Sequence, residues 1–220
     1  MQRSFICCCG CFALVTTMLY ADFPAFDKLP ARKELPDPLV MLDGTKVTTK
    51  DQWLKERRPE LKKLFQHYMY GDFPPPVKVE AKVEHTDTRA LGGKATLKDI
   101  TLTLGGKHKL QLLLVVPNKR SGLAPVFVGL NFNGNHAVLP DKAIRLPTTW
   151  MRGGGKGVQN NRATEEGRGT ELDTWAIEET IDHGFAVALV YYGDIEPDRT
   201  DLREGVQKAF QQGEDRKSVV

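Results

Sequence analysis

Polar residues with possible chemical roles gather at the end of one apolar segment. The stretch VFVGLNFNGNH (residues 126–136) begins with strand-like residues and ends in a turn that contains Asn133, Gly134, Asn135 and His136. Open α/β sheets place their sites at the carboxyl ends of strands, where this turn is expected. Asn and Gly are also common turn residues, and a single histidine is often structural. The residues therefore indicate either a simple turn or the rim of a site.

Two other polar stretches lack the spacing of the sites that they suggest. The glycine-rich residues 152–157, RGGGKG, miss the Gly-x-x-x-x-Gly-Lys-Ser/Thr spacing of a phosphate loop. In the acidic residues 194–205, a calcium loop would need Gly at its sixth position and Glu at its twelfth. The sequence has Arg199 and Gly205 there. Both stretches are therefore interpreted as surface loops.

The serines and cysteines limit the nucleophiles that the chain can offer. Its three serines are Ser4, Ser121 and Ser218, and none lies in a Gly-x-Ser-x-Gly elbow between a strand and a helix. All four cysteines lie within residues 7–11, in a segment expected to be removed. We therefore expect neither a serine-hydrolase elbow nor a catalytic thiol in the mature part of these 220 residues.

The N-terminal segment has the pattern of a secretory signal peptide. Arg3 precedes an uncharged apolar run that ends near Ala21. We expect residues 1–21 to be cleaved, which predicts a secreted or periplasmic protein with no membrane contact after cleavage. A retained membrane anchor and a lipid anchor on Cys11 are the alternatives.

The composition fits one globular domain. Of the 220 residues, 40% are apolar and 27% are charged, and the formal net charge is +3. The most basic stretch, residues 55–63, contains its own glutamates at helical spacing, which predicts a solvated helix face. No nucleic-acid partner is expected from this charge pattern.

The first part of the chain predicts an arm and a helical region. Residues 22–48 are rich in proline and lack periodicity, which indicates an extended arm on the domain surface. A helix should follow, capped by Thr48 or Thr49 and ended by Gly71. We expect Pro59 to split it into two helices.

From Val77 the hydrophobic period changes to two. Residues 77–86 alternate apolar with charged side chains, as a strand with one wet face does. Residues 95–117 predict two more strands around a turn at 105–107, the second one more central. Residues 125–131 are apolar up to Asn131, which predicts a strand buried on both faces.

The last elements complete the expected architecture. Residues 172–185 predict a helix that ends at Gly184. Four of its side chains should face inward: Leu172, Trp175, Ile177 and Ile181. Residues 186–194 predict another buried strand. The fold class is therefore α/β, with a mixed sheet whose early antiparallel strands lead into a parallel β-loop-α-β unit.

Four motifs, in this order and spacing, resemble one known family. They are LPDPL (residues 35–39), YMYGDFPPP (68–76), GLNFNGNH (129–136) and YYGDIEPD (191–198). They are similar to the N-terminal half of glucuronoyl esterases, the 4-O-methyl-glucuronoyl methylesterase-like proteins of carbohydrate esterase family 15. The resemblance covers about residues 35–205.

The resemblance implies a secreted α/β-hydrolase that needs neither metal nor organic cofactor. Such an enzyme cleaves the ester between a glucuronic acid of xylan and a lignin alcohol, so glucuronoxylan or a lignin-carbohydrate ester is the expected substrate. A serine attacks, a histidine relays its proton, an acidic residue orients the histidine, and preorganised donors hold the oxyanion. The loop of Asn133, Gly134, Asn135 and His136 would contribute to the oxyanion hole.

The serine, acid and histidine of this family are expected beyond Val220. The chain would then be a truncated member: residues 49–205 form a partial hydrolase domain, and residues 206–220 form a polar tail. The strand at 187–192 would lack its next neighbour, so the isolated chain should be unstable or aggregate. The alternatives are a non-catalytic carbohydrate-binding or interaction domain and a fragment of another carbohydrate esterase, such as an acetyl-xylan esterase.

Overall fold

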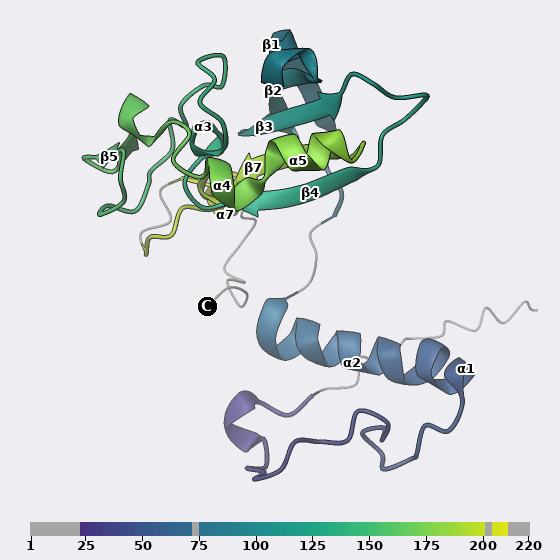
Figure 1. The fold of residues 1–220 in the computed structure, drawn as a ribbon. Coiled ribbons are helices and arrows are strands. Elements are labelled where there is room, and N and C mark those ends of the chain that lie inside the picture. Colours follow the sequence, from purple (N-terminus) through teal and green to yellow (C-terminus); the bar gives the residue numbers. More distant parts are fainter. Residues whose placement is uncertain (1–22, 72–74, 201–203, 211–220) are drawn as a thin grey trace, which may run out of the picture. The chain divides into compact units, whose positions relative to one another are not determined.

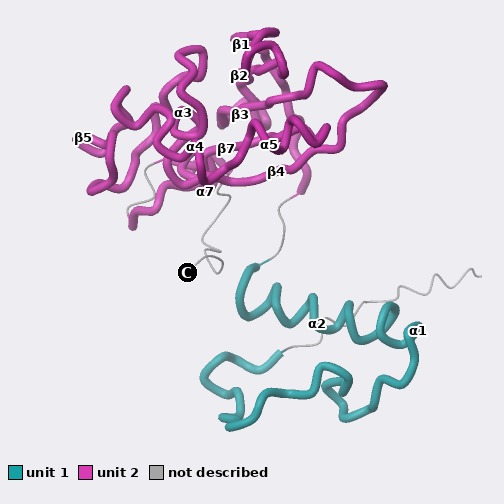
Figure 2. The backbone as a smooth tube through the Cα atoms, in the orientation of Figure 1, with its two compact units in different colours: residues 1–74, 216–220 teal, residues 75–215 magenta. Residues whose placement is uncertain are grey.

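The computed structural model describes residues 23–71, 75–200 and 204–210. The chain divides into two compact units, residues 1–74 with 216–220 and residues 75–215 (Figure 2). The expected signal peptide at 1–21 lies outside the described residues. Within the described ranges, no helix combines the length and the apolar character needed to cross a membrane.

The first unit is built on a helical segment that begins at a capping box. Thr49 accepts a hydrogen bond from the backbone N–H of Gln52 at 3.2 Å, and the Gln52 side chain accepts one from the Thr49 backbone. This arrangement satisfies N–H groups that a helix start leaves free. The segment ends at Gly71, because its φ of 70° lies outside the right-handed helical region. The expected cap and end are confirmed.

The predicted break at Pro59 is wrong. The segment runs through α1 (Lys50–Gln52), a π-helical turn (Trp53–Arg57), α2 (Arg58–Phe65) and a second π-helical turn (Gln66–Tyr70). Pro59 lies in the first turn of α2, and the backbone before it stays helical. A π-helical turn widens the helix by one residue, which accommodates a proline that lacks an N–H and crowds the turn before it.

The arm before the helix packs against the helix. The Arg57 guanidinium is buried, donates to the carbonyl of Pro38 at 3.0 Å and pairs with Glu60 at 2.5 Å. The Tyr68 hydroxyl donates to the carbonyl of Pro24 at 2.8 Å. The basic face of the helix is otherwise exposed as predicted, with Arg57 as the exception. A short 3₁₀ turn, Phe26–Lys28, lies within the arm.

The second unit contains a five-stranded mixed sheet (Figure 1). Its strands, in spatial order, are β1 (Val79–Ala90), β2 (Ala95–Leu104), β3 (His108–Pro117), β7 (Ala186–Tyr191) and β4 (Val126–Asn131). The neighbours from β1 to β7 are antiparallel, and β4 is parallel to β7. The α/β class and the change from antiparallel to parallel pairing are therefore confirmed.

The core lies between this sheet and the helices that follow the long connection after β4. The described core cluster includes Leu97, Leu113, Val115, Val138, Ile144, Ile177, Ile181 and Leu189. These residues come from β2, β3 and β7 and from the segments packed over them. Two short 3₁₀ turns (Leu91–Gly93 and Glu165–Gly167) and the hairpin of β5 (Val158–Gln159) and β6 (Arg162–Ala163) complete the connections.

The predicted single helix at 172–185 is two helices. Ala176 has left-handed backbone angles, φ 42° and ψ 43°, and separates α4 (Leu172–Trp175) from α5 (Ile177–Asp182). The break changes the direction of the first turn, so Leu172 is exposed while Ile177 and Ile181 are buried as predicted. Because a non-glycine residue is strained in this conformation, the packing on both sides must hold Ala176 in place.

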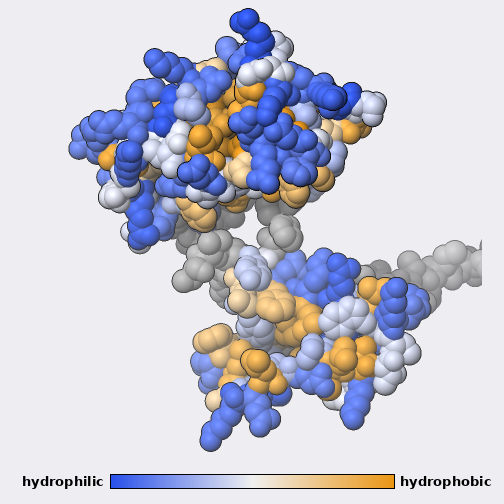
Figure 3. All heavy atoms as spheres, in the orientation of Figure 1, coloured by the Kyte–Doolittle hydropathy of each residue, from blue (hydrophilic) through white to orange (hydrophobic). Residues whose placement is uncertain are grey.

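The strand β4 is not buried on both faces as predicted. It is an edge strand, and four of its side chains are exposed: Val126, Phe127, Val128 and Leu130. Hydrophobic residues are visible on the surface of this region in Figure 3. The expected unpaired edge at 187–192 is also wrong, because β7 lies between β3 and β4. An apolar run predicts the strand but does not show its place in the sheet.

Short helices follow the last strand. β7 passes directly into α6 (Tyr192–Ile195), and α7 (Val206–Phe210) forms within the predicted polar tail. The Phe210 ring lies 5.8 Å from the Lys107 ammonium in the turn between β2 and β3. The start of the tail is therefore packed against the sheet, and residues 211–220 lie outside the described residues.

Candidate functional site

The four predicted site residues lie together at the carboxyl end of β4. Gly134 has φ 88° and turns the chain directly into α3 (Asn135–Val138). Asn135 and His136 are buried, whereas Asn133 lies on the exposed side of the turn. A positive φ is the reason that glycine suits this position.

Two buried amide side chains tie this loop to the sheet. Asn131, the last residue of β4, donates to the Asn135 side chain at 2.7 Å. Asn135 donates in turn to the backbone carbonyl of Gln111 in β3 at 2.9 Å. Asn131 and Asn135 are both fully buried. A buried amide left unpaired is costly, so these contacts favour one conformation of the loop.

Two backbone N–H groups of the same loop have no acceptor among the described residues. Among the described residues, none accepts a hydrogen bond from the backbone N–H of Asn133 or Gly134. The neighbouring turn is closed, because Ala137 donates its N–H to the carbonyl of Gly134 at 3.0 Å. Two adjacent free N–H groups on a fixed loop can hold an anionic oxygen.

His136 is a packed, neutral imidazole. Its side chain is 1% exposed, and a Cβ atom on Gly134 or on Gly167 would lie 2.8 Å from one of its ring nitrogens. Burial, and then the charge of Arg168, lower its pKa to about 4. The ring is therefore uncharged at neutral pH, and its Nδ1 has no hydrogen-bond partner in the described structure. It fills the space between two glycines rather than presenting a proton-relay group.

Glu171 is a contributor to this site that the sequence did not reveal. Its carboxylate accepts a hydrogen bond from the Asn133 side chain and a second one from the Trp175 indole Nε1 at 3.2 Å. The residue lies 38 positions after Asn133 along the chain. No local spacing could have indicated this pairing, and only the return of the long connection brings the two residues together.

An ion pair between an exposed arginine and a buried carboxylate supports the sheet. Asp99 in β2 is 1% exposed, and Arg145 donates to both of its carboxylate oxygens, at 2.6 and 2.9 Å. This carboxylate raises the pKa of Arg145. The Gln111 side chain donates to Asp99 at 3.2 Å and to the Arg145 carbonyl at 3.0 Å. Gln111, whose backbone carbonyl accepts the hydrogen bond from Asn135, is thus itself bound to Asp99 and to Arg145.

The predicted acidic surface loop contains one buried carboxylate. Asp194 accepts hydrogen bonds from the Thr149 hydroxyl at 2.8 Å and from the Gln111 backbone at 3.1 Å. Burial raises its pKa. His108 is partly buried, and its Nε2 lies 2.5 Å from the Asp194 carbonyl. This part of the stretch after β7 is therefore structural, and its exposed carboxylates begin later in the loop.

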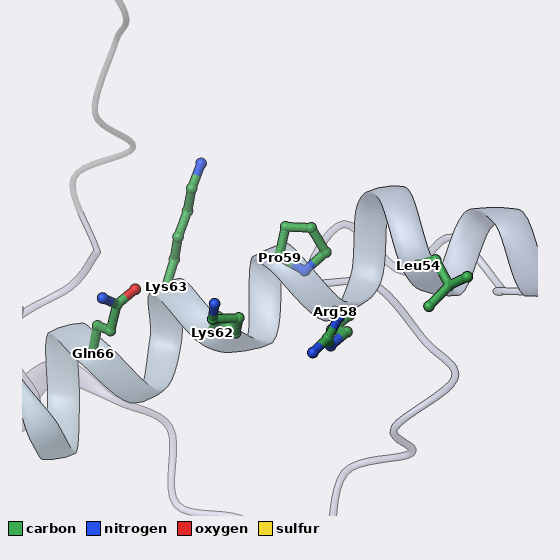
Figure 4. Close-up of a pocket in the computed structure, with 6 residues that line it drawn as sticks. All are labelled: Leu54, Arg58, Pro59, Lys62, Lys63 and Gln66. Atoms are coloured by element: carbon green, nitrogen blue, oxygen red, sulfur yellow. The ribbon is translucent and has the colours of Figure 1, made fainter. Parts of the chain in front are cut away.

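A shallow groove of about 300 Å³ lies along the helix of the first unit (Figure 4). Its lining residues are Leu54, Arg58, Pro59, Lys62, Lys63 and Gln66. The Lys63 side chain points away from those of Arg58 and Lys62 in Figure 4, and no carboxylate is among the residues that line the groove. Among the described residues, no group of three or more His, Cys, Asp and Glu side chains could hold a metal ion. The loop after β4 is therefore the strongest candidate site.

Comparisons with known proteins agree on the identity of this fold. No family model matches the chain. Carbohydrate esterase MZ0003, from an unknown prokaryotic organism, is 43% identical over 183 residues, which are 80% of this chain and 42% of that protein. The 4-O-methyl-glucuronoyl methylesterase of Thermothelomyces thermophilus is 49% identical over 98 residues, which are 44% of this chain and 22% of that protein.

Solved structures give the same result. A glucuronoyl esterase from Solibacter usitatus has a TM-score of 0.72 and 34% identity, with 86% of this chain and 48% of that chain covered. A promiscuous esterase of carbohydrate esterase family 15 from the marine bacterial metagenome has a TM-score of 0.71 and 41% identity. The match covers 83% of this chain and 46% of that chain. The chain spans less than half the length of these relatives. Sequence and fold together place it in carbohydrate esterase family 15, the glucuronoyl esterase family.

Proposed function

We propose that this chain forms the oxyanion-loop side of a glucuronoyl esterase that cleaves the ester between 4-O-methyl-glucuronic acid of xylan and a lignin alcohol. The observation that carries the proposal is the pair of backbone N–H groups at Asn133 and Gly134, which have no acceptor among the described residues and lie on a loop fixed by buried amides. The names of the relatives, which are carbohydrate and 4-O-methyl-glucuronoyl esterases, supply the substrate class.

In this proposal the two N–H groups act when negative charge develops on the ester carbonyl oxygen. A serine oxygen attacks the glucuronoyl carbonyl carbon, and the carbonyl oxygen becomes an oxyanion. Donors fixed before the reaction stabilise that charge without reorganising, which is a large part of catalysis in such enzymes. The serine, the histidine and the acid would come from outside these 220 residues, so the chain alone would be inactive.

The edge of β4 is where the remaining part of such an enzyme would add. β4 pairs with β7 on one side and has no strand partner on the other side among the described residues. Its apolar side chains Val126, Val128 and Leu130 are 48%, 76% and 51% exposed. A further strand would satisfy the backbone edge and cover these side chains. The free N–H groups lie at the end of this same strand.

Complementation tests the proposal. The chain would be co-expressed with the portion of the Solibacter usitatus enzyme that it does not match, and hydrolysis of a benzyl glucuronate ester would be measured. We expect activity from the pair and none from either part alone. The first part of the Solibacter usitatus enzyme, supplied with the same second part, is the positive control.

Other outcomes identify the alternatives. A co-purifying pair with no hydrolysis, while the control pair is active, would contradict the proposal. Binding of glucuronoxylan by the chain alone, together with that result, would support a non-catalytic carbohydrate-binding domain. Hydrolysis of acetyl-xylan but not of glucuronate esters would indicate another carbohydrate esterase.

We also propose that residues 1–21 export the protein and are then removed. The apolar run after Arg3 and the small residue at its end support export. Intact mass of the protein recovered from the culture medium or periplasm should correspond to a chain that begins near residue 22. Recovery of the full-length mass from the membrane fraction would instead support a retained anchor.

A further inference from the structure

We propose that Glu171 is a positioning residue that holds the Asn133–Gly134 turn in the conformation that presents its two backbone N–H groups. The inference rests on the proposed function for its catalytic meaning, but the contact itself can be tested in the chain alone. Glu171 lies at the start of α4, in the long connection between β4 and β7, and reaches the turn from outside the sheet.

The first support is that Asn133 is held through its side chain. The Asn133 amide donates to Glu171 Oε1, and no other described residue makes a side-chain hydrogen bond to Asn133. Asn131 and Asn135, on either side, are anchored inward to the sheet. Glu171 therefore holds the exposed side of the turn through the Asn133 side chain. Without this hydrogen bond, the peptide groups next to Asn133 could rotate.

The second support is that Glu171 is itself fixed by a rigid partner. Trp175 donates its indole Nε1–H to Glu171 Oε2 at 3.2 Å. The ring of Trp175 packs over β4, because a Cβ atom on Gly129 would lie 3.4 Å from it. The carboxylate thus connects the turn to the strand that leads into the turn, through an aromatic side chain with little freedom.

The third support is that the backbone of residues 169–171 is hydrogen-bonded to α3. Gly169 donates its N–H to the His136 carbonyl at 3.0 Å, and Glu171 donates its N–H to the Ala137 carbonyl at 2.8 Å. These bonds fix the register of the segment against the helix that follows the turn. The Glu171 side chain makes no capping bond to its own helix. Its two carboxylate oxygens therefore accept hydrogen bonds from Asn133 and Trp175 instead.

A carboxylate suits this position because two donors converge on it. Glutamate offers two acceptor oxygens, whereas glutamine offers one oxygen and a donor group that would face one of the two N–H groups. Glu171→Gln should keep one of the two contacts, and Glu171→Ala should keep neither. Glu178, which pairs with Lys94 at 2.8 Å on the surface, provides a matched control for loss of a glutamate.

Measurements on the 220-residue chain test the contact directly. In Glu171→Ala, we expect faster amide hydrogen exchange at Asn133, Gly134 and Asn135 and a shifted indole N–H resonance of Trp175. Glu171→Gln should give an intermediate result, and Glu178→Ala should match the wild-type chain. Adding Asn133→Ala to Glu171→Ala should change the exchange at Gly134 and Asn135 little further, because Glu171→Ala has already removed the contact that Asn133 makes.

Kinetics of the complemented enzyme test the positioning role. Glu171→Ala should lower kcat by about tenfold or more with KM changed by less than about twofold, because oxyanion contacts form in the transition state. Equal exchange and an unchanged Trp175 resonance in Glu171→Ala and Glu178→Ala would overturn the proposal. So would unchanged kcat in an active complemented enzyme. If no pair is active, the proposed function fails while the exchange data still decide the role of Glu171.

Discussion

Asn135 and Gln111 connect two strands that are not neighbours in the sheet. Asn135 follows β4, and its side chain donates to the carbonyl of Gln111 in β3 at 2.9 Å, although β7 lies between these strands. Asn131 completes the chain of amides at 2.7 Å. The turn after β4 is therefore attached to the antiparallel half of the sheet as well as to its own strand.

Loss of this connection should destabilise the second unit. Asn135→Ala removes a buried donor and an acceptor and leaves Asn131 without its partner, which should lower the free energy of unfolding by about 1–3 kcal/mol. Urea denaturation followed by circular dichroism measures the change. Gln159→Ala, at an exposed amide in β5, should have an effect below about 0.5 kcal/mol. Equal effects of the two substitutions would contradict a special role for the Asn135 contact.

Two glycines with similar φ should respond differently to alanine. Gly134 and Gly154 have φ of 88° and 93°, so both substitutions place a side chain at a positive φ, which costs about 1–3 kcal/mol. At Gly134 the new Cβ would lie 2.8 Å from His136 and 2.9 Å from Pro147, while at Gly154 nothing lies within 4 Å. Gly134→Ala should therefore lower the melting temperature more than Gly154→Ala does. Equal melting temperatures would show that the turn can open without cost.

The local elements of the fold followed from the sequence because their causes are local. Alternation of apolar and charged residues predicts the strand β1, and a cap at Thr48 or Thr49 predicts the start of the helix at Lys50. The single wet face expected for β1 is wrong, because its apolar side chains Val79 and Val83 are exposed too. The errors arose where long-range packing decides. An apolar run cannot distinguish the edge strand β4 from a central one, and Ala176 adopts a left-handed conformation that its residue type disfavours.

The candidate site was predictable in part for the same reason. The turn residues Asn133 to His136 are contiguous, so their cluster at the end of β4 is visible in the sequence. The bonds that Glu171 and Gln111 make to the loop join residues 38 and 24 positions apart. These bonds depend on strand order and on the path of the long connection, neither of which residue spacing encodes.

Stability should fall between about pH 6.5 and 4 because of His136. Its pKa is about 4 in the folded protein, against 6.5 in an unfolded chain, so the unfolded state binds more protons in this range. The contribution is complete above pH 6.5 and decreases as the pH falls, by about 3 kcal/mol in total. Denaturation at a series of pH values should show this slope in the wild-type chain and a smaller slope in His136→Gln.

The control for this measurement is an exposed histidine. His183 is exposed at the end of α5, and its substitution by glutamine controls for the loss of a histidine outside the core. Asp194 opposes the trend in every variant, because burial raises its pKa and favours its protonated form in the folded state. The difference between the variants therefore isolates His136. A His136→Gln chain with the full wild-type slope would disprove the assignment.

The two edges of the sheet should differ in their tendency to associate. Val128 on β4 is 76% exposed, and its neighbours along the strand are apolar, whereas Val83 on β1 is 50% exposed between Lys82 and Glu84. Charged side chains on an edge strand discourage pairing with another chain, and β4 lacks them. Val128→Lys should therefore reduce self-association of the purified 220-residue chain, and Val83→Lys should not. Static light scattering over a concentration series measures this. Equal scattering by the two variants, or a wild-type chain that stays monomeric at high concentration, would show that the β4 edge is already protected.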